Sequence, residues 1–433
     1  MHNLKKLFPQ SFKNTYHLFQ AIMANIRYGF PSHKIKVIGI TGTNGKTTTT
    51  QMVTKILEKS GKKVAMASTI NFKIGSDQWT NITKYTTESA FAVQGMLKRA
   101  VDAGCEYFIL ETSSHALDQS RVWGVRYAVA VITNVTREHL DYHGTMEKYR
   151  RAKKIIFEMV AKNKGVVVVN LDMKNPQYYL GVEAGTKYGY TLGEQDIKSK
   201  IKNNNEELKI VRAEHVRMGI NNSEFKIQNS KFIVDIPGAF NIENALAATC
   251  VGLSQAISLQ KISEALGEIQ GVPGRMEKVE SGKGFDIFID YAVTPDSLEK
   301  LYVTMTMLKQ KSDTKIIAVF GACGDRDRGK RPLMGKIVSA YADRIIITNE
   351  DPYWEDPQSI IEEVASGVEN KELKKDFWKI LDRRDAIRKA LELARVHDIV
   401  VITGKGAEES MAIKNERIPW NDKKIVLEEL KMV

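Results

Sequence analysis

Residues 37–48 read VIGITGTNGKTT, a short apolar run followed by a glycine-rich loop that ends on lysine and threonine. The apolar run predicts a buried strand, and the residues after the loop predict a helix from about Lys46 to Lys59. A loop between a strand and a helix directs backbone N–H groups and the helix dipole at one point, where phosphate oxygens can be held. The stretch therefore predicts a nucleotide-phosphate site in which Lys46 reaches the β- and γ-phosphates and Thr47 ligates Mg²⁺.

The glycines of this loop stand at positions 39, 42 and 45, and Ile40 occupies the place of the first glycine in the strict Walker pattern. This departure disfavours Ras-like GTPases and most P-loop kinases. A plain glycine-rich turn is the alternative, and the lysine–threonine pair at the predicted helix start argues against it.

Short apolar strands alternate with helices after the loop, a pattern that predicts mostly parallel sheets with helices on both faces. Strands are expected at Val64–Ser68, Tyr107–Glu111, Ala128–Thr133 and Gly165–Asn170, with a helix at Ser89–Ala103. A second alternation gives strands at Asp286–Asp290, Lys315–Phe320, Arg344–Thr348 and Asp398–Thr403. Between about Asp196 and Pro237, a polar stretch that includes Asn203–Asn205, we expect a few antiparallel strands.

These elements predict an α/β protein in three parts. A short basic helical segment over residues 1–35 precedes a central P-loop ATPase-like domain with a parallel sheet over residues 36–270. A Rossmann-like α/β domain is expected over residues 271–433. A chain of 433 residues is long enough for such an organisation.

Composition indicates a cytoplasmic protein without stable membrane insertion. Cys105, Cys250 and Cys323 are too few and too scattered for a disulfide framework or a zinc site. No apolar run approaches the roughly 18–20 residues of a membrane span, and the first residues lack the features of a secretory signal.

The net charge of +12 favours anionic partners. Nucleic acid is not expected, because there is no basic tract and no recognisable nucleic-acid module. A nucleotide and a phosphate-bearing substrate would use the same charge, and solvated lysines without a partner are the alternative. Residues 1–36 hold six Lys or Arg and no Asp or Glu, a net charge of +6.

Large apolar residues recur at helical spacing near the N-terminus, at Leu18, Phe19, Ile22, Met23 and Ile26. They predict one amphipathic helix that ends before the glycine and proline at positions 29 and 31. We interpret it as a helix packed on the next domain. A helix on a membrane surface or against a partner is the alternative.

Polar clusters follow two further strands of the first alternation. Glu111 ends an apolar strand, where a carboxylate would meet the Mg²⁺ held by Thr47, and a polar turn suited to substrate contacts follows it. Residues 138–143 hold two histidines and two carboxylates. They are a candidate metal site, with a solvated loop as the alternative.

In their order along the chain, these motifs resemble the Mur ligase family, MurE type, over about residues 36–425. The phosphate loop is similar to those of Mur ligases and of folylpolyglutamate synthase. The other matching segments are Glu111–Leu117, Arg121-Val122, Asn134–Gly144, Tyr149, Ala152-Lys153, Gly238–Asn241, Asn244–Ala248, Gly274-Arg275, Asp290–Ala292, Thr294–Leu298, Gly324–Pro332 and Gly404–Gly406 with Glu408.

The resemblance implies a role for particular residues at the nucleotide. The ATP contacts are Gly42, Thr43, Asn44, Gly45, Lys46, Thr47, Thr48, Asn241, Asn244, Arg275 and Asp290. The Mg²⁺ ligands, for two ions, are Thr47, Glu111, His139 and Lys153. Lys153 matches the lysine that the family carbamylates with CO₂, which turns a cation into an anion able to orient the second Mg²⁺. The catalytic residues are Lys46, Lys153, His139 and Arg275.

The resemblance also implies the two other substrates. Muramyl-peptide contacts fall on Thr86, Thr87, Ser114, Gln119 and Arg121, and amino-acid contacts on Arg326, Glu350, Asp351, Tyr353, Gly404 and Glu408. The implied reaction transfers the γ-phosphoryl group of ATP to a carboxylate of a UDP-muramyl-peptide, and an amino acid then attacks the acyl-phosphate. A folylpolyglutamate-type ligase on another acceptor, or a nucleotide-binding subunit that needs a partner, are the alternatives.

The chain departs from the MurE pattern in three places. Only about 35 residues precede the phosphate loop, whereas bacterial MurE enzymes carry a UDP-binding domain in that place. The basic helix or a partner would therefore hold the UDP moiety, or the substrate is not UDP-linked. Val293 replaces a usual histidine and Glu138 a usual aspartate. Glu350–Tyr353 reads EDPY where diaminopimelate-adding enzymes have DNPR, so the arginine fork for a distal carboxylate is absent. Lysine or ornithine is therefore expected over diaminopimelate.

Overall fold

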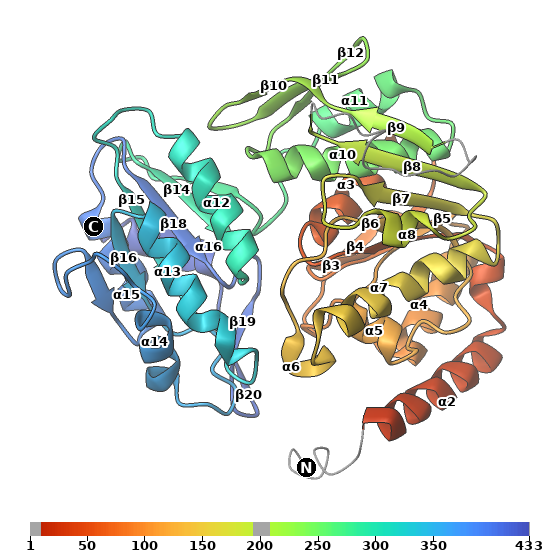
Figure 1. Ribbon diagram of the computed structural model, residues 1–433, viewed down its shortest axis with the longest axis horizontal. Coiled ribbons are helices and arrows are strands. Elements are labelled where there is room, and N and C mark those ends of the chain that lie inside the picture. The colour runs from red at the N-terminus through yellow and green to blue at the C-terminus, as the bar shows by residue number, and fades with distance from the viewer. Residues whose placement is uncertain (1–9, 194–207, 433) are drawn as a thin grey trace.

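The computed structural model describes residues 10–193 and 208–432, which form two α/β domains side by side (Figure 1). Each domain is built around its own sheet, and the predicted α/β class is confirmed. The expected boundary near residue 271 falls between the last helix of the first domain and the first strand of the second. Lys5, Lys6, Asp196 and Asn203–Asn205 lie outside the described residues.

The central domain contains a nine-stranded sheet in the order β4-β3-β2-β5-β1-β6-β7-β8-β9. Its strands are β1 (Lys36–Thr41), β2 (Val64–Ala67), β3 (Asn71–Ile74), β4 (Asp77–Thr80), β5 (Tyr107–Glu111), β6 (Tyr127–Ile132), β7 (Val166–Asn170), β8 (Thr186–Thr191) and β9 (Leu208–Arg212). β1 runs parallel to β5 on one side and to β6 on the other. The carboxyl ends of β1, β5 and β6, from which the predicted site residues extend, therefore meet at one edge of the sheet.

Helices cover both faces of this sheet (Figure 1). They are α3 (Lys46–Lys59), α4 (Ala90–Asp102), α5 (Ser114–Asp118), α6 (Leu140–His143), α7 (Met146–Ala161), α8 (Gln177–Leu180), α10 (Ala239–Ser254) and α11 (Leu259–Gly267). Ser89 is the N-cap of α4, and its side chain accepts a hydrogen bond from the Ala92 backbone N–H. This is the N-cap chemistry that the sequence at that point favours.

Antiparallel pairing occurs in two places in this domain. β10 (Glu214–Met218), β11 (Ser223–Ile227) and β12 (Ser230–Val234) form a small antiparallel sheet, as expected for this stretch. β9 instead pairs parallel to β8 and extends the main sheet. The β3–β4 hairpin beside β2 was not expected, because its strands are short and largely polar.

Close packing explains two glycines of the phosphate loop. A Cβ atom at Gly39 would lie 2.3 Å from Cδ1 of Ile156, so β1 and α7 can approach only because this position has no side chain. Gly45 has a φ of 83° and caps α3, and a Cβ there would lie 2.2 Å from Oδ1 of Asn244. The loop is therefore closed from one side by α10.

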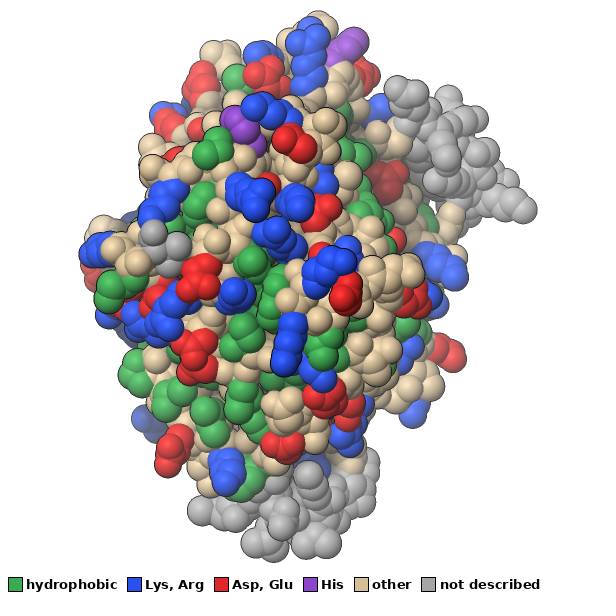
Figure 2. Space-filling model, turned by 90° about the vertical axis from the view of Figure 1, so that its left-hand side faces the viewer, with side chains coloured by type: hydrophobic (Ala, Val, Ile, Leu, Met, Phe, Trp, Pro, Cys, Tyr) green, Lys and Arg blue, Asp and Glu red, His purple; other side chains and the backbone are tan. Residues whose placement is uncertain are grey.

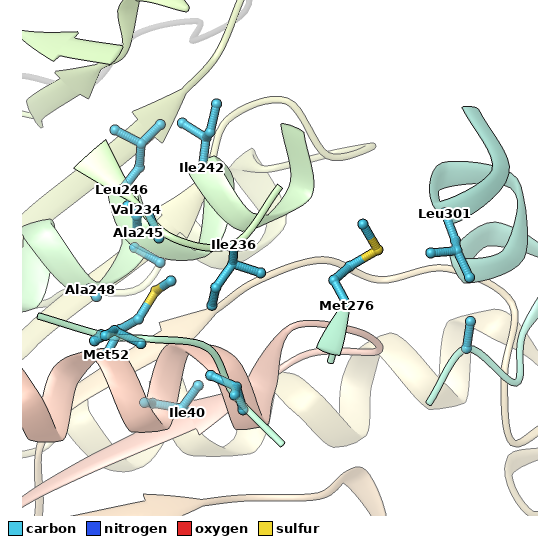
Figure 3. Packing of buried hydrophobic residues seen from close by; sticks show 14 of the residues in the cluster. Ile40, Met52, Val234, Ile236, Ile242, Ala245, Leu246, Ala248, Met276 and Leu301 are labelled. Atoms are coloured by element: carbon cyan, nitrogen blue, oxygen red, sulfur yellow. The ribbon is translucent and has the colours of Figure 1, made fainter. Parts of the chain in front are cut away.

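The largest hydrophobic cluster joins α3, α10 and the sheet and continues into the second domain. Figure 3 shows Ile40 of β1, Met52 of α3 and Ala248 of α10 close together in this cluster. Met276 and Leu301, which belong to the second domain, are part of the same cluster. The apolar contact holds the two domains on either side of the phosphate loop.

The C-terminal domain contains a six-stranded sheet in the order β13-β14-β18-β15-β16-β17. Its strands are β13 (Glu277–Glu280), β14 (Asp286–Asp290), β15 (Ile316–Phe320), β16 (Arg344–Ile347), β17 (Phe377–Lys379) and β18 (Ile399–Thr403). The helices are α12 (Pro295–Met307), α13 (Arg331–Tyr341), α14 (Pro357–Ala365), α15 (Arg383–Leu393) and α16 (Asp422–Glu429), and β19 (Ser410–Ile413) with β20 (Glu416–Pro419) forms a hairpin. All neighbours in the six-stranded sheet run parallel except β13 and β14.

The predicted N-terminal helix is α2 (Gln10–Tyr28), and it packs on α4 of the central domain. Its contact face differs from the expectation. Ala21 and Ala24 are fully buried against Ala90, whereas Phe19 and Ile26 are 61% and 60% exposed. Small residues allow the two helices to approach closely. Of the large apolar side chains that suggested a packed face, Leu18 and Ile22 are partly buried, whereas Phe19, Met23 and Ile26 are exposed.

The surface carries both signs of charge. Figure 2 shows Lys and Arg side chains interspersed with Asp and Glu over the outer face of the C-terminal domain. Among the helices of the described segments, 10–193 and 208–432, none is long and apolar enough to cross a membrane.

Candidate active site

The phosphate loop lies at the carboxyl end of β1, facing the C-terminal domain. Nζ of Lys46 donates to the backbone carbonyl of Thr43 at 2.8 Å, and Asn134 at the end of β6 accepts a hydrogen bond from the Asn44 backbone N–H at 2.9 Å. Burial lowers the pKa of Lys46, and Glu111 partly opposes that shift. A partly buried lysine whose Nζ donates to a backbone carbonyl is suited to contact the oxygens of a phosphate.

Glu111 at the end of β5 is bound by hydroxyl groups from both neighbouring strands' loops. Thr47 Oγ1 lies 3.1 Å from both carboxylate oxygens. Thr69, which follows β2, donates to the same carboxylate through its hydroxyl at 2.9 Å and its backbone N–H at 2.8 Å. Two of the predicted Mg²⁺ ligands are thus in contact. Thr69 escaped the sequence analysis, although its place at a strand end beside β5 was the signal that identifies it.

Lys153 lies beneath the loop, on α7. The residue is 1% exposed. Its Nζ donates a hydrogen bond to the carbonyl of Gly42 at 2.6 Å and lies 4.5 Å from the ring centre of Tyr149. Burial lowers the pKa of Lys153 well below its usual value, and the charge of Lys46 lowers it further. The lowered pKa favours the neutral amine, the form that reacts with CO₂.

The predicted loop around His139 folds into an aromatic cluster. The rings of His115 and His139 lie 4.6 Å apart, and Nε2 of His143 lies 3.0 Å from Oγ of Ser114. Burial lowers the pKa of His139 well below 6.5, and the neighbouring His115 and Lys153 lower it further. Within the described part of the chain, no group of three or more His, Cys, Asp and Glu side chains could hold a metal ion. The interpretation of residues 138–143 as a metal site by themselves is therefore wrong.

Glu138 links the two domains instead. Oε1 accepts a hydrogen bond from Nζ of Lys330 at 3.1 Å, and both side chains are nearly buried. Its other oxygen, Oε2, has no hydrogen-bond partner among residues 10–193 and 208–432. Burial raises the pKa of Glu138, and Lys330 acts in the opposite direction. An unpaired carboxylate oxygen beside the phosphate loop is an acceptor left over for a ligand.

The C-terminal domain contributes a cation and a carboxylate to the loop. Nη2 of Arg275 lies 3.4 Å from Oγ1 of Thr47, and its guanidinium group lies 4.4 Å from the ring centre of Tyr291. Asp290 accepts a hydrogen bond from the Met276 backbone N–H at 2.7 Å. Burial raises the pKa of Asp290.

The cleft around these groups contains most of the predicted ATP contacts. On the α10 side, Thr49 Oγ1 donates to Oδ1 of Asn244 at 3.3 Å, and Asn244 donates to Asn241 at 3.3 Å. The residues that line the cleft are Thr43, Asn44, Gly45, Lys46, Thr47, Thr48, Thr69, Thr86, Glu111, Asn134, Glu138, His139, Phe240, Asn241, Glu243, Asn244, Arg275, Asp290, Tyr291, Ala292, Val293, Thr294, Ser297, Lys300 and Leu301. Gly42 and Lys153 lie behind the loop.

The predicted muramyl-peptide contacts gather around α5. Oγ1 of Thr87 donates to the carbonyl of Glu111 at 2.9 Å, and Thr86 accepts from Thr69 at 3.1 Å. Arg121 donates to Oε1 of Gln119 at 2.8 Å and to the carbonyl of Thr87 at 3.1 Å. These residues therefore form one polar surface that continues from the phosphate loop.

A second pocket lies on the other side of Arg275, and of the predicted amino-acid contacts only Glu408 lines it. Nζ of Lys84 lies 2.8 Å from Asp351 and 3.1 Å from Glu408, and Lys405 lies 2.8 Å from Asp351 and also contacts Glu408. We call Lys84, Asp351, Lys405 and Glu408 the four-charge cluster. The pKa of Lys405 is raised, because the carboxylates of Glu408 and Asp351 outweigh the effect of burial. The pKa of Asp351 is lowered, because the ammonium groups of Lys405 and Lys84 outweigh the effect of burial.

The two neighbouring acids that were predicted to contact the amino acid lie in different surroundings. Glu350 is 2% exposed, accepts a hydrogen bond from the Cys323 thiol at 2.8 Å and lies behind Gly404, so it does not face the pocket. Asp351 is already paired with two ammonium groups. Tyr353 has a φ of 49° and stacks with Arg326, whose guanidinium group lies 5.3 Å from its ring centre.

Two cations of this pocket were not foreseen. Lys84 follows β4, and Arg417 in β20 donates to the carbonyls of Ile82 and Thr83 at 2.7 and 3.1 Å. Both contacts cross between the domains, and nothing in the local sequence marks them. The pocket is lined by Thr69, Ile70, Asn81, Ile82, Lys84, Arg275, Tyr291, Lys405, Ala407, Glu408, Glu409, Ser410 and Arg417.

Comparison with known proteins gives consistent results along the chain. Residues 40–252 match the Mur ligase middle domain, and residues 274–406 match the family described as Mur ligase, glutamate ligase domain. A UDP-N-acetylmuramyl-tripeptide synthetase of Roseiflexus sp. (strain RS-1) is 38% identical over 93% of this chain and 80% of its own length. A UDP-N-acetylmuramoyl-L-alanyl-D-glutamate–2,6-diaminopimelate ligase of Syntrophomonas wolfei is 39% identical over 95% of this chain and 81% of its own.

A solved structure of a ligase with this second name has a TM-score of 0.59 and 30% identity, over 92% of this chain and 78% of the other. The similarity spans both domains and the cleft between them.

Proposed function

The chain belongs to the Mur ligase family, and on this premise we propose how its cleft carries out the family's reaction. It is an ATP-dependent, ADP-forming ligase that makes an amide bond in peptidoglycan precursor synthesis, adding an amino acid to a muramyl-peptide. The observation that carries the site assignment is the convergence of Lys46, Thr47 and Glu111 from one domain with Arg275 from the other.

The γ-phosphoryl group of ATP lies, in this proposal, between Lys46 and Arg275. It passes to the carboxylate of the muramyl-peptide, and the two cations offset the charge that builds on the phosphoryl oxygens. The amino group of the incoming amino acid then attacks the acyl carbon, and phosphate leaves. Because the cations come from different domains, the domains must be close together for the transfer, which also excludes water from the acyl-phosphate.

Mg²⁺ would be held at Thr47 and Glu111, and His139 with a carbamate on Lys153 would serve a second ion. The donor set fits a hard cation, because Glu111 supplies an anionic oxygen and Glu138 has an unused one at the same cleft. Bound Mg²⁺ supplies charge neutralisation on the phosphates. The lowered pKa and burial of Lys153 support the carbamate, since a neutral buried amine combines with CO₂ to give an anion.

We assign the muramyl-peptide to the surface formed by Thr86, Thr87, Ser114, Gln119 and Arg121. This surface continues from the phosphate loop, so a carboxylate bound there can reach the γ-phosphate. Whether a partner holds the UDP moiety stays a prediction.

We assign the incoming amino acid to the pocket beside the four-charge cluster. The ammonium of Lys84 lies between Asp351 and Glu408, so this pair accepts an alkylammonium group on a flexible chain. The distal ammonium of lysine or ornithine would take the place of Lys84. Several relatives at 36–39% identity are named for 2,6-diaminopimelate. In this chain, however, Tyr353 stands where an arginine would hold the distal carboxylate of that substrate. We therefore propose lysine or ornithine over diaminopimelate.

The test is ATP-dependent phosphate release with UDP-muramyl-dipeptide and a panel of amino acids, with folate plus glutamate as the competing pair. The proposal expects stoichiometric phosphate and amide product with the muramyl acceptor and a diamino acid. Turnover with folate and glutamate alone would refute the acceptor assignment.

A further inference from the structure

An exposed apolar stripe runs along α2. Tyr16, Phe19, Met23, Ile26 and Phe30 are spaced alternately three and four residues apart, which places them on one face of the helix and its C-terminal end. Their side chains are 57%, 61%, 42%, 60% and 37% exposed. Single exposed apolar residues are ordinary, but four in one line on one helix, with a fifth just beyond its end, indicate a contact surface.

The opposite face of α2 already holds the helix on the central domain. Ala21 and Ala24 are buried against α4, and Asn25 donates to the carbonyl of Trp123 at 2.8 Å. Figure 1 shows α2 along the outer edge of the central domain, beside α4 and α5. The stripe is therefore not a face that the domain itself covers.

Charge identifies the occupant of the stripe. α2 contains Lys13 and Arg27 and no acidic residue, and exposed His33, Lys34 and Lys36 follow its C-terminal end. Two acids of the central domain lie nearby. Asp118 accepts hydrogen bonds from Asn14 and from the hydroxyl of Tyr142, and Glu106, which lines one groove with His33, Lys34 and Lys36, is paired with Lys62.

A second copy of the chain fits this face poorly. In a two-fold pair of helices, the cations that flank the stripe would face other cations, because the helix offers no carboxylate to pair with them. An anionic surface pairs with every one of them.

We propose that α2 lies flat on an anionic membrane surface, with Tyr16, Phe19, Met23, Ile26 and Phe30 in the headgroup–acyl boundary and Lys13 and Arg27 among the lipid phosphates. Aromatic side chains are favoured at this depth, and basic residues beside them add electrostatic attraction. The helix binds the surface without crossing it. The ligase would then work at the membrane face while its cleft stays in water.

The test is flotation of the full chain with vesicles of phosphatidylcholine alone or mixed with phosphatidylglycerol. We expect binding to the mixed vesicles that weakens as salt is raised, and little binding to phosphatidylcholine. The double variant Phe19→Ser/Ile26→Ser should bind at least about tenfold more weakly. Met307→Ser/Val396→Ser, which changes two side chains of similar exposure (62% and 61%) on the C-terminal domain, is the matched control and should bind like the parent.

A second variant separates charge from fold. Lys13→Gln/Arg27→Gln should lose the preference for phosphatidylglycerol by roughly tenfold or more while its thermal unfolding matches the parent. Equal binding to both vesicle types, or no binding to either, would overturn the proposal. So would a dimer in sedimentation that Phe19→Ser/Ile26→Ser dissociates while vesicles leave the parent unbound, because the stripe would then contact a second copy.

Discussion

The nucleotide side and the amino-acid side of the cleft are built in opposite ways. Around the phosphate loop, the cations Lys46 and Arg275 and the buried amine of Lys153 form hydrogen bonds mainly to carbonyls or hydroxyls. In the four-charge cluster, two lysines and two acids neutralise one another. The first arrangement is prepared for an anion that arrives with the substrate, whereas the second must exchange partners when its substrate binds.

The largest effect is expected at the phosphate loop. Lys46→Ala should reduce phosphate release by on the order of a thousandfold or more, because a positioned cation at a transferring phosphoryl group contributes several kcal/mol. The fold should survive, since within residues 10–193 and 208–432 Nζ donates only to the Thr43 carbonyl, and burial, which lowers its pKa, disfavours its charge. Steady-state phosphate release and thermal unfolding check this, and near-parent turnover would remove the loop from the mechanism.

A substitution of Lys153 tests whether a carbamate on this residue supplies an anionic Mg²⁺ ligand beside the phosphate loop. Lys153→Ala should lose about a hundredfold or more in rate, and added short carboxylates should restore part of it by replacing the carbamate. Lys148→Ala, on the exposed side of α7, is the matched control. A high-resolution electron-density map that shows an unmodified Lys153 amine pointing away from bound nucleotide would contradict the carbamate.

A substitution of Lys84 tests the role of the four-charge cluster. Lys84→Met removes the ammonium that competes for Asp351 and Glu408, so KM for lysine or ornithine should fall by about tenfold while kcat changes little. Initial rates over a range of amino-acid concentrations measure this split. If Lys84 instead holds a distal carboxylate, the variant will raise KM for diaminopimelate and leave lysine unchanged.

The substitution with the smallest expected effect on the rate with lysine is at Tyr353, which sets selectivity. With the parent enzyme, lysine or ornithine should exceed meso-diaminopimelate in kcat/KM by roughly tenfold or more, since a lost charge-assisted pair costs about 1.5–3 kcal/mol. Tyr353→Arg should narrow this gap, and Tyr353→Phe should leave it unchanged. Faster turnover of diaminopimelate by the parent would show that another basic residue holds the carboxylate.

The contrast also explains what the sequence revealed. The phosphate loop is contiguous, and strand-end residues such as Glu111 are brought to it by parallel pairing, so local pattern was sufficient. The four-charge cluster joins Lys84 to residues near 350 and 405, and no local pattern encodes that meeting. In the same way, the large side chains of α2 suggested a packed face, whereas the small Ala21 and Ala24 make the close contact. Helix amphipathicity indicates that an apolar face exists but not which surface covers it.

Isotope transfer is the most direct test of the claim that the cleft forms an acyl-phosphate. A muramyl-peptide acceptor labelled with oxygen-18 in its reacting carboxylate is turned over with ATP and a diamino acid, and the released phosphate is analysed by mass spectrometry. The account predicts that one labelled oxygen per amide bond appears in the phosphate, because the carboxylate oxygen attacks the γ-phosphorus and leaves with it. Amide product formed with unlabelled phosphate would contradict the account.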